Sequence, residues 1–176
     1  MDRLVFFGTP EFAVPTLEAL CAAGGAPMNV VSQPSRPAGR GRHLQDPPVV
    51  RWARQEGLPV VQPEDVREPA FLEWMEALGP AVAVVVAFGQ IFPRALLEIP
   101  THGCINLHAS MLPSYRGAAP IQAAIVAGET TTGVTTMLME EGLDSGPILL
   151  QDELAIGPLE TAGELSVRLA KVGAQL

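Results

Sequence analysis

Ala81-Val82-Ala83-Val84-Val85-Val86-Ala87 is an uninterrupted run of small and β-branched apolar residues that has the length of a strand. Both faces of this strand would be apolar, which is typical of a central parallel strand that helices cover on each side. Parallel neighbours need crossover connections, and these are usually helices. The run therefore predicts the centre of a parallel sheet in an α/β fold.

Strand and helix patterns alternate on both sides of this run. Thr161 and Glu164 form a capping-box pattern that marks the start of the last predicted helix. The predicted strands are residues 3–7, 28–32, 58–61, 81–87, 104–108, 132–139 and 148–156, and the predicted helices are residues 12–24, 48–57, 68–78, 118–127 and 161–176. This order predicts a Rossmann-like, doubly wound, mostly parallel sheet with helices on both faces.

Length and composition favour one domain with a sizeable core. The chain has 176 residues, of which 48% are hydrophobic, and a domain of this size buries roughly 70% of the surface that its unfolded chain exposes. The longest apolar stretch is only as long as a strand, so we expect no membrane span. Asp2 and Arg3 lead directly into a short strand without the form of a signal peptide, and we expect a cytoplasmic protein. Cys21 and Cys104 lack metal-ligand spacing, so no metal site is predicted.

The residues with the clearest chemistry lie in the stretch Gly103-Cys104-Ile105-Asn106-Leu107-His108-Ala109-Ser110. Asn106 and His108 are two residues apart, and side chains at this spacing point to the same face of a strand. An amide donor beside an imidazole suits acyl-type transfer, in which charge develops on a carbonyl oxygen and the attacking group loses a proton. The pattern alone leaves open a purely structural role for His108 at the end of its strand.

A second stretch offers a carboxylate to the same site. Residues 133–139 include a β-branched run, and the acidic, glycine-punctuated loop Glu140-Glu141-Gly142-Leu143-Asp144-Ser145-Gly146 follows them. In the catalytic interpretation, Asp144 returns to His108 and holds its ring in orientation. The alternative is that Asp144 caps a glycine-rich turn.

Three further motifs stand outside these stretches. They are Phe7-Gly8-Thr9-Pro10-Glu11-Phe12-Ala13-Val14-Pro15, Gln33-Pro34-Ser35-Arg36-Pro37-Ala38-Gly39-Arg40-Gly41 and Arg116-Gly117-Ala118-Ala119-Pro120-Ile121-Gln122. Taken together, the motifs resemble those of the formyltransferases that use 10-formyltetrahydrofolate as formyl donor, and within that group the methionyl-tRNA formyltransferase family. The resemblance runs from Leu4 to the end of the chain and implies the formyltransferase fold. It places Asn106, His108 and Asp144 on the catalytic Asn-x-His and Asp positions of the group.

The resemblance also implies two folate-binding segments. Phe88, Gly89 and Ile91 follow the central strand and would hold the pterin, although an ordinary strand–helix connection explains the same spacing. Ser110, Met111, Leu112 and Pro113 correspond to the Ser-Leu-Leu-Pro turn with which the family contacts the folate, and Met in place of Leu keeps the size and the apolar character. The folate would be a co-substrate, and no metal is expected beside it.

Residues 33–48 contain four prolines, two glycines and several arginines, and we expect no regular structure there. Because the whole chain has a net charge of −8, these arginines form a basic patch on an acidic body. The resemblance implies that Arg36, Arg40 and Arg42 reach the acceptor arm of initiator tRNA, and a solvated loop is the alternative. Ser35 stands where the family usually has Asp.

A member of this family would transfer a formyl group from 10-formyltetrahydrofolate to the α-amino group of initiator Met-tRNA, and we expect it to be a monomer. Residues 1–176 would form the catalytic domain without its own C-terminal end and without the tRNA-binding β-barrel domain of the family. Glycinamide ribonucleotide formyltransferases are the first alternative, but Gly8-Thr9-Pro10-Glu11-Phe12 lacks their glycine- and serine-rich phosphate-binding start. Sugar-nucleotide N-formyltransferases also stay open, as does a non-catalytic folate- or tRNA-binding module.

Overall fold

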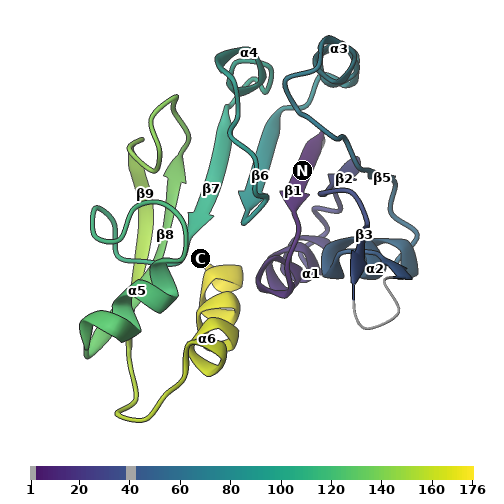
Figure 1. Ribbon diagram of the computed structural model, residues 1–176. Coiled ribbons are helices and arrows are strands. Elements are labelled where there is room, and N and C mark those ends of the chain that lie inside the picture. The colour runs from purple at the N-terminus through teal and green to yellow at the C-terminus, as the bar shows by residue number, and fades with distance from the viewer. Residues whose placement is uncertain (1–2, 39–42) are drawn as a thin grey trace.

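A mostly parallel β-sheet forms the centre of the molecule (Figure 1). The computed structural model describes residues 3–38 and 43–176. Among these residues the sheet has seven strands in the order β5-β2-β1-β6-β7-β8-β9. Neighbouring strands are parallel from β5 to β7, and β8 runs antiparallel to both β7 and β9. The strands are β1 (Leu4–Gly8), β2 (Asn29–Val31), β5 (Val60–Val61), β6 (Val82–Val86), β7 (Cys104–His108), β8 (Thr131–Leu138) and β9 (Ile148–Ala155).

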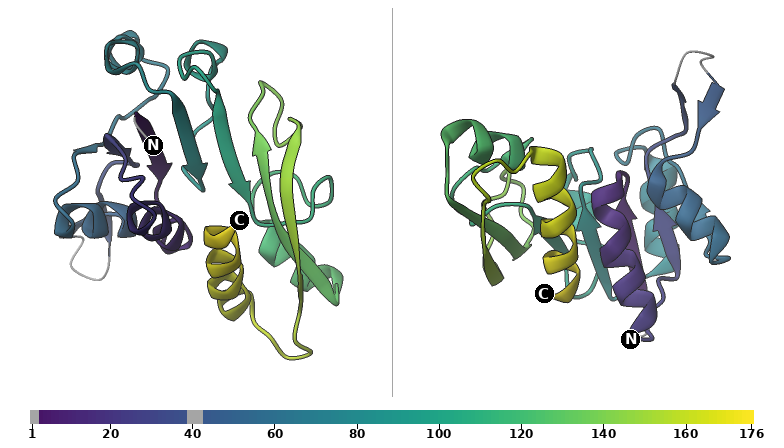
Figure 2. Two further views of the ribbon diagram at one scale, coloured as in Figure 1. Left: turned by 180° about the vertical axis from the view of Figure 1, so that it is seen from behind. Right: turned by 90° about the horizontal axis from the view of Figure 1, so that it is seen from below.

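Helices cover both faces of this sheet, so the expected fold class is confirmed. One face packs against α1 (Val14–Ala22), α2 (Pro48–Gln55) and α6 (Ala162–Gln175), and α1 and α6 lie side by side there (Figure 2). The other face packs against α3 (Pro69–Leu78) and the short α4 (Arg94–Leu97). A 3₁₀ turn, η1 (Glu11–Ala13), precedes α1, and α5 (Pro120–Ala127) follows β7. The capping box of Thr161 and Glu164 begins α6 as predicted.

The two apolar cores explain why β1 and β6 are apolar throughout. In β1, Leu4 and Phe6 belong to the core under α1, α2 and α6, whereas Val5 and Phe7 belong to the core under α3 and α4. Successive side chains of a strand point to opposite faces, and both faces here are buried. The sheet therefore has no solvated face at its centre.

The chain winds outward in both directions from the pair β1 and β6. From β1 it proceeds to β2 and β5 on one side, and from β6 it proceeds to β7 and β8 on the other. Ligands of open α/β sheets bind in the crevice beyond the carboxyl ends of the strands at such a switch point. The loops that follow β1, β6 and β7 meet at this crevice.

Residues 33–48 contain a two-stranded hairpin, so the expectation that they lack regular structure was wrong. β3 (Arg36–Ala38) pairs antiparallel with β4 (His43–Gln45), and Pro37 lies opposite Leu44. A two-stranded ribbon tolerates proline because each strand uses only one of its two edges for pairing. The hairpin projects from the body of the domain (Figure 2). Arg40 and Arg42 lie outside the described residues.

Across the described part of the chain, no helix is both long enough and apolar enough to cross a membrane.

Candidate active site

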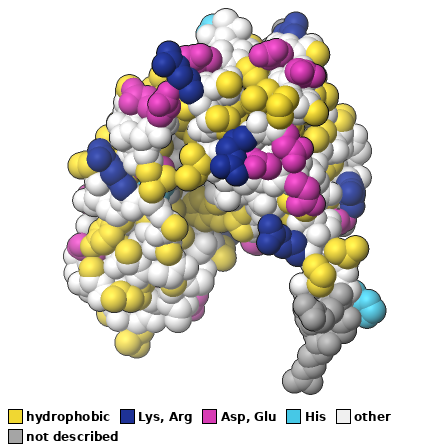
Figure 3. All heavy atoms as spheres, turned by 45° about the horizontal axis from the view of Figure 1, so that its top comes forward, with side chains coloured by type: hydrophobic (Ala, Val, Ile, Leu, Met, Phe, Trp, Pro, Cys, Tyr) yellow, Lys and Arg dark blue, Asp and Glu magenta, His cyan; other side chains and the backbone are white. Residues whose placement is uncertain are grey.

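A cleft of about 720 Å³ opens beyond the carboxyl ends of the central strands. Its walls come from the turn after β1, the loop after β6, the end of β7, the approach to α5 and the loop between β8 and β9. In the space-filling view, hydrophobic side chains gather in a hollow of the surface (Figure 3). Ligand sites of small-molecule enzymes are typically clefts of about 300–1,000 Å³ with mainly apolar walls, and this cleft agrees with both properties.

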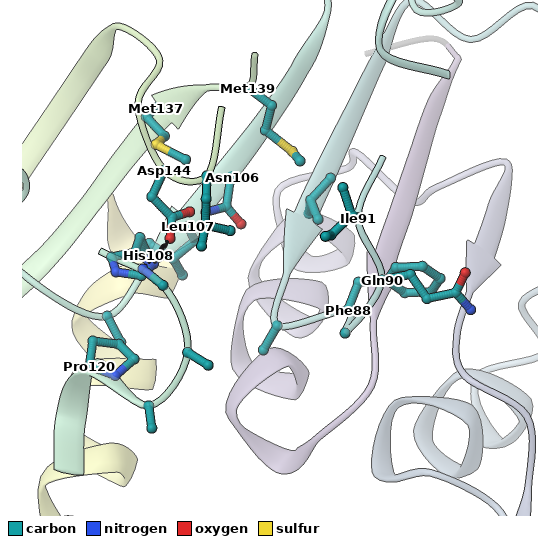
Figure 4. Close-up of a pocket in the computed structure, with 18 of the residues that line it drawn as sticks. Phe88, Gln90, Ile91, Asn106, Leu107, His108, Pro120, Met137, Met139 and Asp144 are labelled. Atoms are coloured by element: carbon teal, nitrogen blue, oxygen red, sulfur yellow. Dashed lines mark hydrogen bonds and ion pairs between the residues drawn. The ribbon is translucent and has the colours of Figure 1, made fainter. Parts of the chain in front are cut away.

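The cleft brings together the three predicted catalytic residues. Asn106 and His108 come from β7, and Asp144 comes from the loop between β8 and β9 (Figure 4). Oδ2 of Asp144 lies 3.6 Å from Nδ1 of His108, and both side chains are nearly buried. An amide, an imidazole and a carboxylate therefore meet on one wall, which is the set that addition of a nucleophile to a carbonyl group needs.

The segment between β7 and α5 holds both the imidazole and the carboxylate. Nε2 of His108 lies 2.9 Å from the carbonyl oxygen of Tyr115. A carbonyl oxygen only accepts, so this geometry calls for a proton on Nε2, and Nδ1 is the nitrogen that faces Asp144. The N–H of Gly117 donates to Oδ2 of Asp144 at 2.7 Å. Two backbone groups, two residues apart, thus fix the relative orientation of the two side chains.

Four non-glycine residues have left-handed backbone conformations around the cleft. They are Ala87 (φ 46°), Tyr115 (φ 55°), Ala119 (φ 60°) and Asp144 (φ 48°). Such conformations cost of order 1–3 kcal/mol each and persist where the surrounding structure determines them. They occur at three separate loops around one cleft, and outliers of this kind cluster at active sites and ligand clamps.

The loop after β6 forms the opposite wall, and Phe88, Gly89 and Ile91 all line the cleft. The ring of Phe88 is buried against Phe7 and Phe92, with centroid separations of 5.3 and 5.9 Å, so it supports the loop from behind. Gly89 has a φ of +93°, a conformation that L side chains rarely adopt. Ile91 is 77% exposed at the rim.

Gln90 and Thr9 fix this loop, and the sequence pattern did not single out either role. Oε1 of Gln90 accepts from the N–H of Val66 at 2.9 Å, and its Nε2 donates to the carbonyl of Glu64 at 3.1 Å. The hydroxyl of Thr9 donates to the carbonyl of Phe88 at 2.8 Å. The Gly-Thr-Pro turn after β1 therefore ties the first strand to the loop after β6.

The described structure does not place Ser110, Met111, Leu112 or Pro113 on the walls of the cleft. The buried hydroxyl of Ser110 donates to the carbonyl of Ser114 at 2.6 Å, and the buried hydroxyl of Thr135 donates to the carbonyl of Ser110 at 2.7 Å. The N–H of Leu112 donates to the same Thr135 hydroxyl at 3.1 Å. These hydrogen bonds tie the turn to β8.

The arginines near the hairpin divide into two groups. Arg51 donates to the carbonyl of Asp46, and Arg54 forms an ion pair with the carboxylate of the same residue. Ser35 also donates to this carboxylate, at 2.5 Å, so a residue that departs from the family pattern still takes part in a side-chain hydrogen bond at the base of the hairpin. Arg36 lies exposed on β3.

Several residues that line the cleft were not predicted from the sequence. Pro10, Phe12, Ala118, Pro120, Gln122, Met137, Met139 and Ser166 also line the cleft. Pro10, Phe12 and residues 118–122 belong to the motifs of residues 7–15 and 116–122. These motifs were therefore the sequence signal from which the wall residues could have been predicted. Within residues 3–38 and 43–176, no group of three or more His, Cys, Asp or Glu is placed to hold a metal ion.

Comparison with known proteins relates both the sequence and the fold to formyltransferases. A family model described as formyl transferase matches residues 2–176. The methionyl-tRNA formyltransferase of Thermodesulfovibrio yellowstonii is 55% identical over 173 residues, which are 98% of this chain and 56% of that protein. That of Moorella thermoacetica is 56% identical over 174 residues, which are 99% of this chain and 56% of that protein. The chain therefore spans little more than half the length of these relatives.

The fold extends to a more distant group. The crystal structure of a phosphoribosylglycinamide formyltransferase from Bacillus halodurans matches with a TM-score of 0.82 at 20% sequence identity, over 99% of this chain and 91% of that one. A likeness at this identity concerns the fold alone.

Proposed function

This chain belongs to the formyl transferase family, and from this membership we propose that it transfers a formyl group from 10-formyltetrahydrofolate to the α-amino group of methionyl initiator tRNA. The names of the relatives at 55% and 56% identity support this acceptor. The observation that carries the proposal is the meeting of Asn106, His108 and Asp144 at one end of the cleft.

Each of the three residues has one task in this reaction. Asn106 donates its amide N–H to the oxygen on which negative charge develops when the amine adds to the formyl carbon, and losing one such donor typically costs about 10²- to 10³-fold in rate. His108 accepts the proton of the attacking amine through Nδ1, because Tyr115 occupies Nε2. The bond between the formyl carbon and N10 of the folate then breaks, and this proton passes to N10. Asp144 stabilises the protonated imidazole and keeps Nδ1 toward the cleft.

The walls of the cleft fit a flat, partly apolar heterocycle. Ile91 and Met137 supply apolar surface (Figure 4), as does Leu143, and the loop after β6 also lines the cleft. Phe88, Gly89 and Ile91 therefore belong to the proposed folate site. The folate supplies an activated formyl group on nitrogen when it is bound, and the chain orients it against Asn106.

The hairpin of β3 and β4 is the proposed tRNA contact, through Arg36, Arg40 and Arg42. Arg36 lies exposed on β3. Arginine side chains suit phosphate oxygens because of their planar, multiply donating group. The folate turn of Ser110, Met111, Leu112 and Pro113 remains a proposal on the basis of its motif, although these residues do not line the cleft.

The test is a formyl-transfer assay with the protein at its natural length, on Met-tRNA and on glycinamide ribonucleotide in parallel. Transfer to Met-tRNA alone, with His108→Ala inactive, is the expected result. His102→Ala is the matched control, since His102 is exposed in the turn before β7 and should leave transfer unchanged. Transfer to the ribonucleotide, or an active His108→Ala variant, would overturn the proposal.

A further inference from the structure

The backbone of Tyr115 has an unusual conformation beside the catalytic histidine. Its φ of 55° lies in the left-handed region, where a bulky residue is a genuine outlier. This conformation directs the carbonyl of Tyr115 to Nε2 of His108, at 2.9 Å. Something must hold Tyr115 in this state, because a left-handed backbone brings the Cβ of an L-residue too close to the following carbonyl oxygen.

The side chain of Tyr115 is anchored at a distant point of the sequence. Its hydroxyl donates to Oε1 of Glu129 at 2.5 Å, and this hydrogen bond raises the pKa of the Tyr115 hydroxyl. Glu129 lies directly after Gly128, which ends α5 in a left-handed conformation. The N–H of Glu129 donates to the carbonyl of Ala124 at 3.1 Å, so its backbone is part of the helix end. The anchor is therefore attached to a fixed element.

We propose that Tyr115 and Glu129 are positioning residues that set the tautomer of His108. Their hydrogen bond holds the carbonyl of Tyr115 against Nε2–H, which leaves Nδ1 free to exchange a proton in the cleft. Only the kinetic part of this inference rests on the proposed function, because the tautomer is a property of the protein without substrate.

The alternative tautomer shows why His108 needs the hydrogen bond between Tyr115 and Glu129. With Asp144 only 3.6 Å from Nδ1, a neutral imidazole that is not held at Nε2 gains by moving its proton to Nδ1 and donating to the carboxylate. That ring has no lone pair on Nδ1 and cannot accept the proton of the amine there. The carbonyl of Tyr115 opposes this exchange, and Glu129 keeps the carbonyl in place.

The test uses the protein at its natural length, with ¹⁵N-labelled histidine and the variants Tyr115→Phe and Glu129→Ala. Long-range ¹H–¹⁵N correlation at alkaline pH distinguishes the two neutral tautomers, and a His108→Ala spectrum assigns the His108 signal among the histidines of the protein. We expect the Nε2–H form in the unmodified protein and a large share of the Nδ1–H form in both variants. The kcat of formyl transfer should fall about 10- to 100-fold while the KM for folate changes little.

Two further variants separate positioning from general stability. Glu129→Gln keeps an acceptor oxygen for the Tyr115 hydroxyl and should keep the Nε2–H tautomer and most of kcat. Glu164→Ala removes carboxylate hydrogen bonds of 2.8 and 2.9 Å at the start of α6, and it should lower stability without changing the His108 signal.

An unchanged tautomer in Tyr115→Phe and Glu129→Ala would overturn the inference, even if their melting temperatures fell. A changed tautomer in Glu164→Ala would overturn it as well, because the effect would then be one of general loosening. If the unmodified protein formylated no Met-tRNA, the proposed function would fail. The tautomer measurement would still decide whether the hydrogen bond between Tyr115 and Glu129 sets the tautomer of His108.

Discussion

Oδ2 of Asp144 accepts the N–H of Gly117 at 2.7 Å while it faces Nδ1 of His108 at 3.6 Å. One carboxylate oxygen thus has two roles. It holds the loop through the N–H of Gly117, and it places a negative charge beside the imidazole of His108. An asparagine at this position keeps an oxygen for Gly117 and removes the negative charge beside His108. The two roles can therefore be separated by one substitution.

We expect Asp144→Asn to lower kcat about 10²- to 10³-fold, within the range of lost acid–base assistance. Its free energy of unfolding should stay within about 1 kcal/mol of the unmodified protein, because the hydrogen bond to Gly117 remains. Formyl-transfer kinetics and urea unfolding measure the two quantities. Asp152→Asn, on the exposed strand β9, is the control, and an Asp144→Asn variant with full kcat would remove the carboxylate from the mechanism.

The loop after β6 offers a test of folate binding that leaves the proposed catalytic residues intact. In Gln90→Ala, the loop loses two hydrogen bonds to residues 64 and 66. We expect the KM for folate to rise about 5- to 10-fold, with kcat nearly unchanged, since the loss of two ordinary hydrogen bonds loosens the wall by about 1–3 kcal/mol.

Gln62→Ala is the matched control for this prediction. Gln62 also bridges two segments through its amide, to the carbonyl of Gln33 and the hydroxyl of Ser35, but it does so at the base of the hairpin. A comparable rise in the KM for folate in Gln62→Ala would mean that neither effect is local to the cleft.

Arg40 and Arg42 test the proposed tRNA contact. Replacing both with Gln should weaken the use of tRNA and reduce the salt dependence of its binding by about one unit of slope for each phosphate that the variant no longer binds, while the KM for folate stays unchanged. Binding of Met-tRNA at several salt concentrations measures the slope. Equal reductions of tRNA and folate binding would speak against a contact that is specific for tRNA.

Periodicity was sufficient to predict the layers of the fold, because the apolar run of β6 has to be buried on both faces. It also placed Asn106 and His108 on one side of β7, since side chains of a strand alternate strictly. The contact between His108 and Tyr115 could not be predicted, because a left-handed φ at a bulky residue has no sequence signal. The hairpin was missed because prolines normally disfavour strands.

The position of the Ser110–Pro113 turn follows from a contact that is distant in sequence. Its backbone groups at Ser110 and Leu112 pair with the hydroxyl of Thr135 on β8. A motif shows which residue types recur together but does not show which way their side chains and backbone groups point. For this reason the motif alone could not predict that this turn pairs with β8.

Thr135 is buried, and its hydroxyl joins three partners, so its loss should destabilise the protein. Thr135→Val keeps the shape but leaves the N–H of Leu112, the carbonyl of Ser110 and Nε2 of Gln151 without this partner. We expect the free energy of unfolding to fall by about 2–4 kcal/mol, since each unsatisfied buried group costs about 1–3 kcal/mol. Urea unfolding measures it. Thr131→Val, exposed at the start of the same strand, should change stability by no more than about 0.5 kcal/mol, and equal effects in the two variants would contradict this explanation.

Cys104 predicts a specific dependence of stability on alkaline pH. Burial in β7 raises the pKa of its thiol from 9.0 to about 12. In the unfolded chain the thiol ionises near its ordinary pKa, whereas in the folded protein it stays neutral until about pH 12. Its contribution to stability is therefore fully present below pH 9 and is lost as the pH rises from 9 toward 12.

Cys104→Ala lacks this ionisation, so its free energy of unfolding should fall less steeply over that interval, as measured by urea unfolding at a series of pH values. Cys21→Ala is the comparison, since Cys21 is less buried and should flatten the curve less. Parallel curves for Cys104→Ala and the unmodified protein would mean that the thiol ionises equally well in both states, and that the interior of the sheet at β7 admits water.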